Sequence, residues 1–187
     1  MGDTVYVKME DTRSALVRAG IELLEETGAA DVGLREIARR AGVSHGAPRR
    51  WFPTHKSLLA AIAEVGVKDL SATLAAAVEP EDDLPALAAA YVDFARRRPA
   101  MFTLIFRHDL LEGSGAQLRN VSQPLFTWLI TMVERSVGSD DAPQRAAALW
   151  TGVHGIAVLS STGALGLAAT GVDEGDLIDR VVRNSLR

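Results

Sequence analysis

Basic side chains are concentrated in one short stretch of an otherwise acidic chain. Six Arg and Lys residues lie between Arg35 and Lys56 against a single acid, Glu36, whereas the whole chain of 187 residues has a formal net charge of −4. Such a cluster of positive charge is what the binding of nucleic-acid phosphates requires. Because 17 of the 20 basic residues are Arg, no single Arg is informative, and a solvated helical hairpin is the alternative interpretation.

The elements expected to position these charges are two short helices joined by a tight turn. Apolar residues at spacings of three, four and seven give the first helix one buried face: Leu34, Ile37, Ala38 and Ala41. Gly42 can end that helix in the left-handed conformation, and Ser44 is expected to cap the second helix. Pro48 and Trp51 would supply its inward face. This pattern is typical of a helix-turn-helix, whose second helix reads DNA.

Pro48 is unusual in a reading helix. If Ser44 is the N-cap, Pro48 removes the first intrahelical hydrogen bond. If the helix instead starts at Pro48, the ring occupies its favoured first position. We therefore predict an irregular or tightened turn over residues 45–47, rather than a regular helix from His45 through Trp51.

The stretch from Thr12 to Leu59 resembles the DNA-binding domain of the tetracycline-repressor (TetR) family. It contains ALVRAGIELLEETG, then LREIARRAGVS, a segment ending in Trp51-Phe52, and KSLLAAIA opening a long helix. Further on, LWTGVHG resembles a C-terminal subtype named for a Trp and a His-Gly pair, here Trp150, His154 and Gly155. The expected domains are an N-terminal DNA-binding domain at 1–58 and a C-terminal effector-binding and dimerisation domain at 59–187.

Several positions depart from the family pattern. Gly33 stands where the family has a capping Ser or Thr, which costs a few tenths of a kcal/mol. Arg49 and Arg50 stand where Tyr is usual, and they could read guanine or grip phosphate. His55 stands where the family has Lys, with Lys56 next to it, so a phosphate contact could move by one residue or become pH-sensitive.

The predicted DNA contacts divide into two kinds. We expect Arg49, Arg50 and His45 near base edges. Contacts to phosphates or sugars are expected from Arg35, Trp51, His55 and Lys56. The full predicted set is Arg35, Ser44, His45, Gly46, Ala47, Arg49, Arg50, Trp51, His55 and Lys56. Arg39 and Arg40 are not in this set, because their side chains could instead be exposed to solvent.

The remaining sequence predicts an all-α protein of about nine helices. The chain is 48% hydrophobic and 24% charged, without cysteine, and no β-type alternation is sustained. Besides the reading unit, helices are expected at about 12–27, 54–78, 85–97, 100–107, 116–137, 143–165 and 174–186. Residues 1–11 are expected to form a mobile arm and 112–115 a loop. The polar start predicts no signal peptide and a cytoplasmic location.

The apolar segment from Ala146 to Val172 has two interpretations. It carries no charged residue, which meets the length requirement of a membrane span. Three consecutive hydroxyl residues, five glycines and His154 favour a buried helix of a water-soluble protein instead. Small residues along it would permit close helix packing: Ala146, Ala147, Gly152, Gly155 and Ala157. We therefore expect a homodimer on a palindromic operator. The resemblance implies that the helices at 143–165 and 174–186 form its interface.

The resemblance also implies a pocket for a small hydrophobic effector in the C-terminal half. The candidates are Phe94, Met101, Phe102, Ile105, Phe106, Phe126, Trp128, Met132, Trp150 and His154. Each of these side chains could equally be part of the core.

The helix-turn-helix and its basic charge predict a DNA-binding transcriptional regulator, and the resemblance implies a homodimeric repressor that an effector releases from DNA. An activator or a co-repressor-dependent regulator is the second hypothesis. A small helical enzyme is the third, but Ser160, His154 and Asp109 have no catalytic motif around them. The sequence indicates no cofactor, and four scattered histidines suggest no metal site: His45, His55, His108 and His154.

Overall fold

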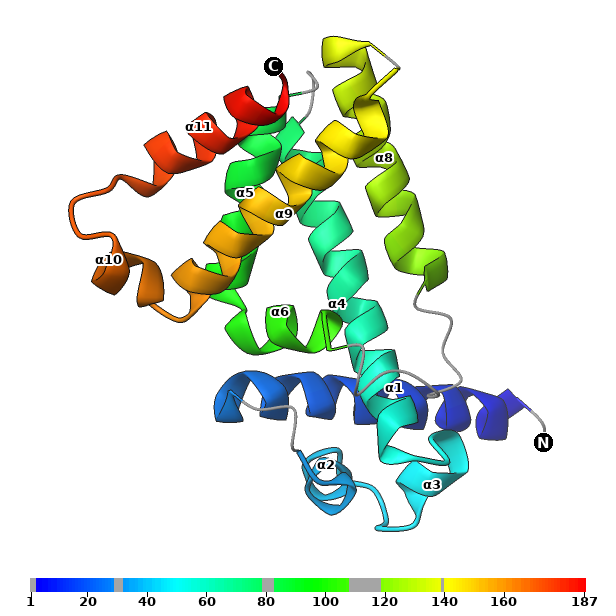
Figure 1. The fold of residues 1–187 in the computed structure, drawn as a ribbon. Coiled ribbons are helices and arrows are strands. Elements are labelled where there is room, and N and C mark those ends of the chain that lie inside the picture. Colours follow the sequence, from blue (N-terminus) through cyan, green and yellow to red (C-terminus); the bar gives the residue numbers. More distant parts are fainter. Residues whose placement is uncertain (1–2, 29–31, 79–82, 108–118, 139) are drawn as a thin grey trace. The chain divides into compact units, whose positions relative to one another are not determined.

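The computed structural model describes residues 3–28, 32–78, 83–107, 119–138 and 140–187. These ranges contain ten helices and no strand, which confirms the all-α prediction (Figure 1). The helices are α1 (Asp3–Thr27), α2 (Leu34–Arg40), α3 (Ala47–Trp51), α4 (His55–Val78), α5 (Leu84–Arg97), α6 (Pro99–Ile105), α8 (Arg119–Val137), α9 (Ala142–Ser161), α10 (Ala164–Ala168) and α11 (Glu174–Ser185).

The chain forms two compact units. The first comprises Met1–Gly66 and Ala100–Leu118, and the second comprises Val67–Pro99 and Arg119–Arg187. Helix α4 therefore contributes its first half to one unit and its second half to the other. The domain boundary expected between residues 58 and 59 remains a prediction.

The core of the first unit is built where α1, α2 and α4 meet. Leu16 and Leu24 of α1, Ile37 of α2 and Leu58 of α4 are almost completely buried. At Gly20 an added Cβ would lie 2.5 Å from the Cδ1 atom of Ile62, so α1 approaches α4 closely at this point. The packing of α1 against α4 therefore positions α2 and α3.

Helix α6 also packs on α4 within the first unit. An added Cβ at Gly66 would lie 2.8 Å from the Cγ atom of Met101 and 3.0 Å from the Cγ2 atom of Ile105. Met101 is fully buried. The absence of a side chain at Gly66 therefore permits the close approach of α6 to α4.

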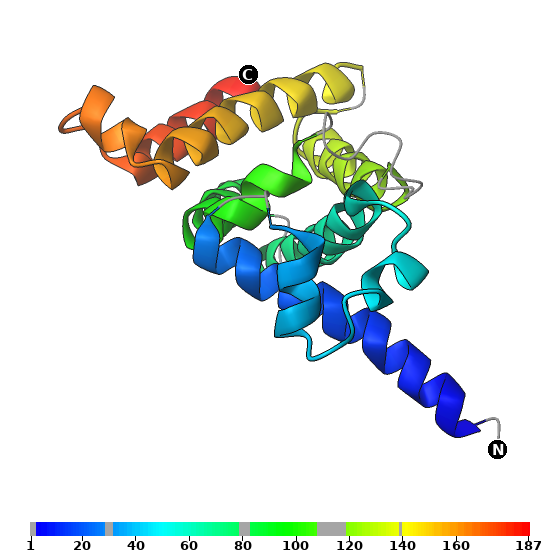
Figure 2. The same cartoon turned by 90° about the horizontal axis from the view of Figure 1, so that it is seen from below.

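The second unit is organised around α9, which packs against α5, α8, α10 and α11 (Figures 1 and 2). Helix α11 approaches α9 closely, because an added Cβ at Gly152 would lie 2.7 Å from Val181 Cγ1. The hydroxyl of Ser160 at the end of α9 donates to Glu174 at the start of α11. Across the described ranges, no helix has the combination of length and hydropathy needed to cross a membrane.

Two predicted helix boundaries were wrong. Residues 1–11 were expected to form a mobile arm, but α1 already begins at Asp3. The helix can extend this far because no Gly or Pro occurs between Asp3 and Ala19. The helix expected at 143–165 ends at Ser161, because Gly163 adopts a left-handed φ of 72° before the short α10. The loop expected at 112–115 lies outside the described residues. In α8, Pro124 lies inside the helix and does not end it.

Candidate nucleic-acid interface

Helix α2 ends as its sequence predicts. Gly42 has a left-handed φ of 67°. Its N–H donates to the carbonyl of Arg39, and the N–H of Val43 donates to the carbonyl of Ala38. These two bonds form a Schellman motif, which satisfies the last carbonyls of the helix and turns the chain sharply toward α3.

The segment between the two helices is a turn, as Pro48 predicts. The N–H of Ala47 donates to the carbonyl of Ser44 at 2.9 Å, and α3 begins only at Ala47 with Pro48 in its first turn. Ser44 was expected to cap α3, but the N-cap is Gly46 and no side chain caps this helix. The expectation for Ser44 was wrong because the pyrrolidine ring moves the helix start to where Pro is tolerated.

Helix α4 has a strong N-terminal cap next to the reading unit. The Ser57 N–H donates to the Thr54 hydroxyl at 3.0 Å, and the Thr54 N–H donates to the Ser57 hydroxyl at 3.2 Å. This reciprocal arrangement is a capping box. It fixes the first turn of α4, which carries His55 and Lys56.

The side chain of His55 is hydrogen-bonded to the backbone that precedes α2. Its Nε2 atom lies 2.7 Å from the carbonyl oxygen of Val32. Because a carbonyl only accepts, Nε2 must carry the proton and donate it. His55 therefore ties α4 to the entrance of α2, where Gly33 provides no side-chain cap.

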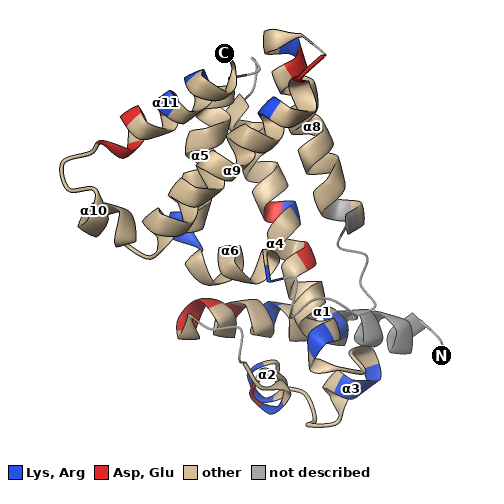
Figure 3. Ribbon diagram, in the orientation of Figure 1, with Lys and Arg blue, Asp and Glu red and all other residues tan. Residues whose placement is uncertain are grey.

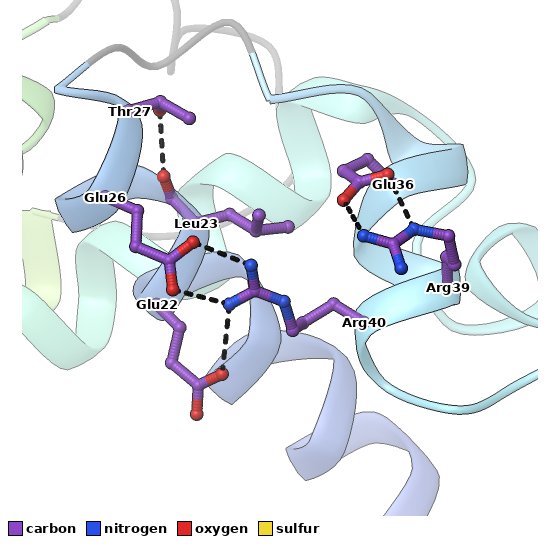
Figure 4. A network of polar contacts seen from close by, with 7 residues as sticks. All are labelled: Glu22, Leu23, Glu26, Thr27, Glu36, Arg39 and Arg40. Carbon is purple, nitrogen blue, oxygen red and sulfur yellow. Dashed lines mark hydrogen bonds and ion pairs between the residues drawn. The ribbon is translucent and has the colours of Figure 1, made fainter.

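Arg39 and Arg40 are not bare solvated cations (Figure 4). Arg39 forms a bidentate pair with Glu36, at 3.0 and 2.5 Å. Arg40 donates to both carboxylate oxygens of Glu26, at 2.7 and 2.6 Å, and lies 3.7 Å from Glu22. These guanidinium groups hold the pKa of Glu36 and of Glu26 below the usual range. The positive charge of both arginines is therefore compensated within the fold.

Three other arginines of the reading unit have side chains without a charge partner among the described residues. Arg35, Arg49 and Arg50 are exposed, and none has a hydrogen bond or ion pair with another described residue. Figure 3 shows basic residues on α2, on α3 and at the start of α4, and acidic residues gathered at the C-terminal end of α1. The basic residues of the helix-turn-helix therefore lie on the same side as α3.

The structure places the ten predicted DNA contacts on α2, the turn, α3 and the start of α4. Ala47, Trp51 and His55 are half-buried, and the other seven are exposed. Their assignment to DNA remains a prediction. One basic residue near α3 was not predicted: Arg13 of α1, whose guanidinium carbon lies 5.4 Å from the centre of the Phe52 ring. No spacing rule connects residues 39 positions apart, so the sequence gave no signal for this contact.

The ten candidate effector contacts divide between the two units. The first unit holds Met101, Phe102, Ile105 and Phe106; the second holds Phe94, Phe126, Trp128, Met132, Trp150 and His154. Phe94, Met101, Phe102 and Met132 are buried, as core residues would be, and the others are more exposed. Their role in a pocket remains a prediction.

The second unit contains a polar chain among these aromatic residues. The Tyr91 hydroxyl is hydrogen-bonded to His154 Nδ1 at 2.9 Å and accepts from Trp150 Nε1 at 3.4 Å. The Phe126 ring meets Trp150 edge-on, with centroids 5.9 Å apart. Tyr91 was not among the predicted residues, because a single Tyr on an apolar helix face has no distinguishing pattern. Burial raises the pKa of Tyr91 above its usual value and lowers that of His154.

Comparisons with known proteins agree with this arrangement. Residues 16–62 match the model of bacterial regulatory proteins of the tetR family, and residues 84–184 match the tetracyclin repressor-like C-terminal domain. The chain is 29% identical over 162 residues to the HTH-type transcriptional regulator CymR of Pseudomonas putida, covering 80% of this chain and 79% of CymR.

Solved structures show the same fold over almost the whole length. A protein of unknown function from Rhodococcus sp. RHA1 has a TM-score of 0.79 and 29% identity, with 94% of each chain covered. The regulatory protein SCO4313 has a TM-score of 0.76 and 19% identity, covering 97% of this chain and 98% of that one. The chain belongs to the TetR family of bacterial transcriptional regulators, and its helix-turn-helix is the DNA-binding element of that family.

Proposed function

We propose that the protein is a cytoplasmic, homodimeric repressor that binds a palindromic operator and leaves it when a small hydrophobic effector binds. The observation that carries the DNA-binding part is the exposed positive charge of Arg35, Arg49 and Arg50 on the helix-turn-helix, whose side chains have no partner among the residues that the structure describes. Charges that are not neutralised within the fold are those that can replace counterions on DNA phosphates.

Within this surface the proposed roles differ by position. Arg49 and Arg50 lie on α3, and His45 lies in the turn before it, so these side chains are assigned to base edges. Arg35 and Lys56 lie on the flanking helices and are assigned to phosphates.

The test is fluorescence anisotropy of the purified protein on DNA from around its own gene, against scrambled DNA, at two salt concentrations. Tight, salt-sensitive binding to one palindromic fragment is the expected result. Equal and weak binding to every fragment would contradict an operator next to the gene. A reporter assay in a strain that lacks the gene then distinguishes repression from activation.

The dimer is proposed to form through α9 and α11. One side of α9 exposes Gly155 and the apolar side chains of Val158 and Leu159 to solvent. A helix that is apolar on its outer side as well as its inner side requires a second partner. Light scattering at micromolar concentration should give twice the chain mass of 20.0 kDa, and Val158→Glu should shift the protein toward monomer. A wild-type monomer would contradict the proposal.

The effector is proposed to be hydrophobic because the rings of Tyr91, His154, Trp150 and Phe126 lie against one another in the second unit. Effector binding would shift the population toward a geometry that does not fit the operator. Compounds that release labelled DNA can be selected by anisotropy and then measured by titration calorimetry. An effector that binds equally tightly with and without operator would rule out this mechanism.

A further inference from the structure

Arg13 of α1 lies at the end of the reading helix. Its guanidinium carbon is 5.4 Å from the centre of the Phe52 ring, a cation–π distance. Phe52 is the C-cap of α3, and its N–H donates to the Pro48 carbonyl at 2.7 Å. Phe52 is also buried, with 3% of its surface exposed. The ring is therefore a fixed support that places the charge of Arg13 beside the C-terminal end of α3.

Arg13 has no charge partner among the side chains that the structure describes, which begin at Thr12. Its side chain is exposed and forms no hydrogen bond or ion pair with any of them. This separates it from Arg39 and Arg40, whose guanidinium groups are bound to carboxylates. A guanidinium held over an aromatic ring still has N–H donors for a second, anionic partner.

We propose that Arg13 binds a DNA phosphate, so that α1 extends the DNA-binding surface beyond the helix-turn-helix. This inference rests on the DNA binding proposed for α3. Phosphate is the expected target because Arg13 belongs to α1, outside the reading helix, and a guanidinium donates bidentately to phosphate oxygens. The Phe52 ring restricts the Arg13 side chain before DNA binds, which reduces the entropy lost on contact.

The experiment compares three variants with the wild type: Arg13→Gln, Arg13→Lys and Arg18→Gln. Arg18 is a matched control, because it is exposed on the same helix and has no partner among the described residues. Five residues correspond to roughly 140° around a helix, so Arg18 faces a different side from Arg13. The probe is a labelled random-sequence duplex of about three helical turns, and the affinity is measured by anisotropy over a series of salt concentrations.

The expected result is a flatter salt dependence in one variant only. Arg13→Gln should reduce the slope of log affinity against log salt by about 0.9, the value for one phosphate contact, while Arg18→Gln leaves it unchanged. Arg13→Lys retains the charge and should retain most of the slope. If Arg13→Gln weakens binding with the wild-type slope and a lower melting temperature, Arg13 only supports Phe52 and the proposal is wrong.

Failure of this inference can be distinguished from failure of the proposed function. A wild-type protein without salt-dependent DNA binding would contradict both. A wild-type protein that binds with a clear salt slope, together with an Arg13→Gln variant of identical slope, would contradict only the role of Arg13. An equal loss of slope in Arg13→Gln and Arg18→Gln would indicate that the charges of α1 attract DNA only through their summed electrostatic field. That result would also contradict a specific contact of Arg13 with a phosphate.

Discussion

The carboxylate of Glu26 accepts two hydrogen bonds from the guanidinium of Arg40, so that the last turn of α1 is joined to the last residue of α2 (Figure 4). The two residues are 14 positions apart, and both are near the protein surface. Arg40 therefore links α2 to α1 within the reading unit. Its position in a basic cluster of the sequence had suggested a solvated or DNA-facing role.

Glu26→Gln should lower the melting temperature slightly at low salt, and high salt should remove most of the difference, because exposed ion pairs are weak and screened. The pKa of Glu26 is depressed in the folded state. Its contribution is therefore present above the unfolded-state pKa of about 4.3 and is lost as the pH falls through the lower folded-state value. Melting curves of wild type and variant should converge toward pH 3.

Glu36→Gln is the matched control, since it removes the same charge but breaks a pair within α2. It should leave the link between α1 and α2 intact and affect DNA binding less than Glu26→Gln. Equal behaviour of the two variants in DNA binding would contradict a positioning role for Arg40.

Arg49→Ala and Lys56→Ala should weaken DNA binding in different ways. Loss of a base-reading guanidinium at Arg49 should cost about 1–3 kcal/mol on the operator and relax specificity at one position. Loss of a phosphate contact at Lys56 should weaken all sequences alike and reduce the salt slope by about 0.9. Both effects can be measured by anisotropy on operator and scrambled duplexes. Parallel losses on both duplexes in the two variants would show that the roles are assigned wrongly.

Gly66→Ala should destabilise the protein, because its methyl group would collide with Met101 and press on Ile105. Overpacking of this kind costs about 1–3 kcal/mol, which exceeds the roughly 1 kcal/mol of helix propensity that Ala gains over Gly. Met101→Ala alone should cost about 2–5 kcal/mol. In that background Gly66→Ala has room and should become stabilising by about 1 kcal/mol. Urea denaturation measures all four proteins; additive effects would contradict the packing described.

His154 should make the stability of the second unit depend on pH. Burial lowers the pKa of His154 in the folded state, so the unfolded chain takes up a proton first as the pH falls. Stability should therefore decrease as the pH falls below about 6.5, the unfolded-state value. Urea midpoints at pH 7.5 and at pH 5.5 test this, and His154→Gln should reduce the difference.

Local rules predicted the elements whose ends are determined by neighbouring residues. Helix α2 ends at Arg40, and Gly42 just beyond it takes the left-handed conformation that completes the Schellman motif. The irregular turn before α3 followed from Pro48 alone, and it is confirmed by the start of α3 at Ala47. The TetR resemblance, carried by the order and spacing of such signals, is confirmed as the family of the chain.

Contacts between distant positions could not be predicted in the same way. The pairing of Arg40 with Glu26, the stacking of Arg13 on Phe52 and the bond between Tyr91 and His154 all join separate helices. Each depends on how two helices are rotated against one another, which hydrophobic spacing restricts only to a broad face. Charge counting alone therefore overstated the positive charge of α2, since it did not show which arginines are neutralised.

The late start of α3 limits what can be transferred from relatives to this regulator. Ser44, His45 and Gly46 precede the helix, so their side chains do not follow the 100° steps that relate positions along a regular recognition helix. A correspondence between residues and bases taken from a relative with a longer helix would be out of register here. An engineer who wishes to retarget this protein should therefore randomise Ser44 and His45 together with Arg49 and Arg50, and select for new operators directly.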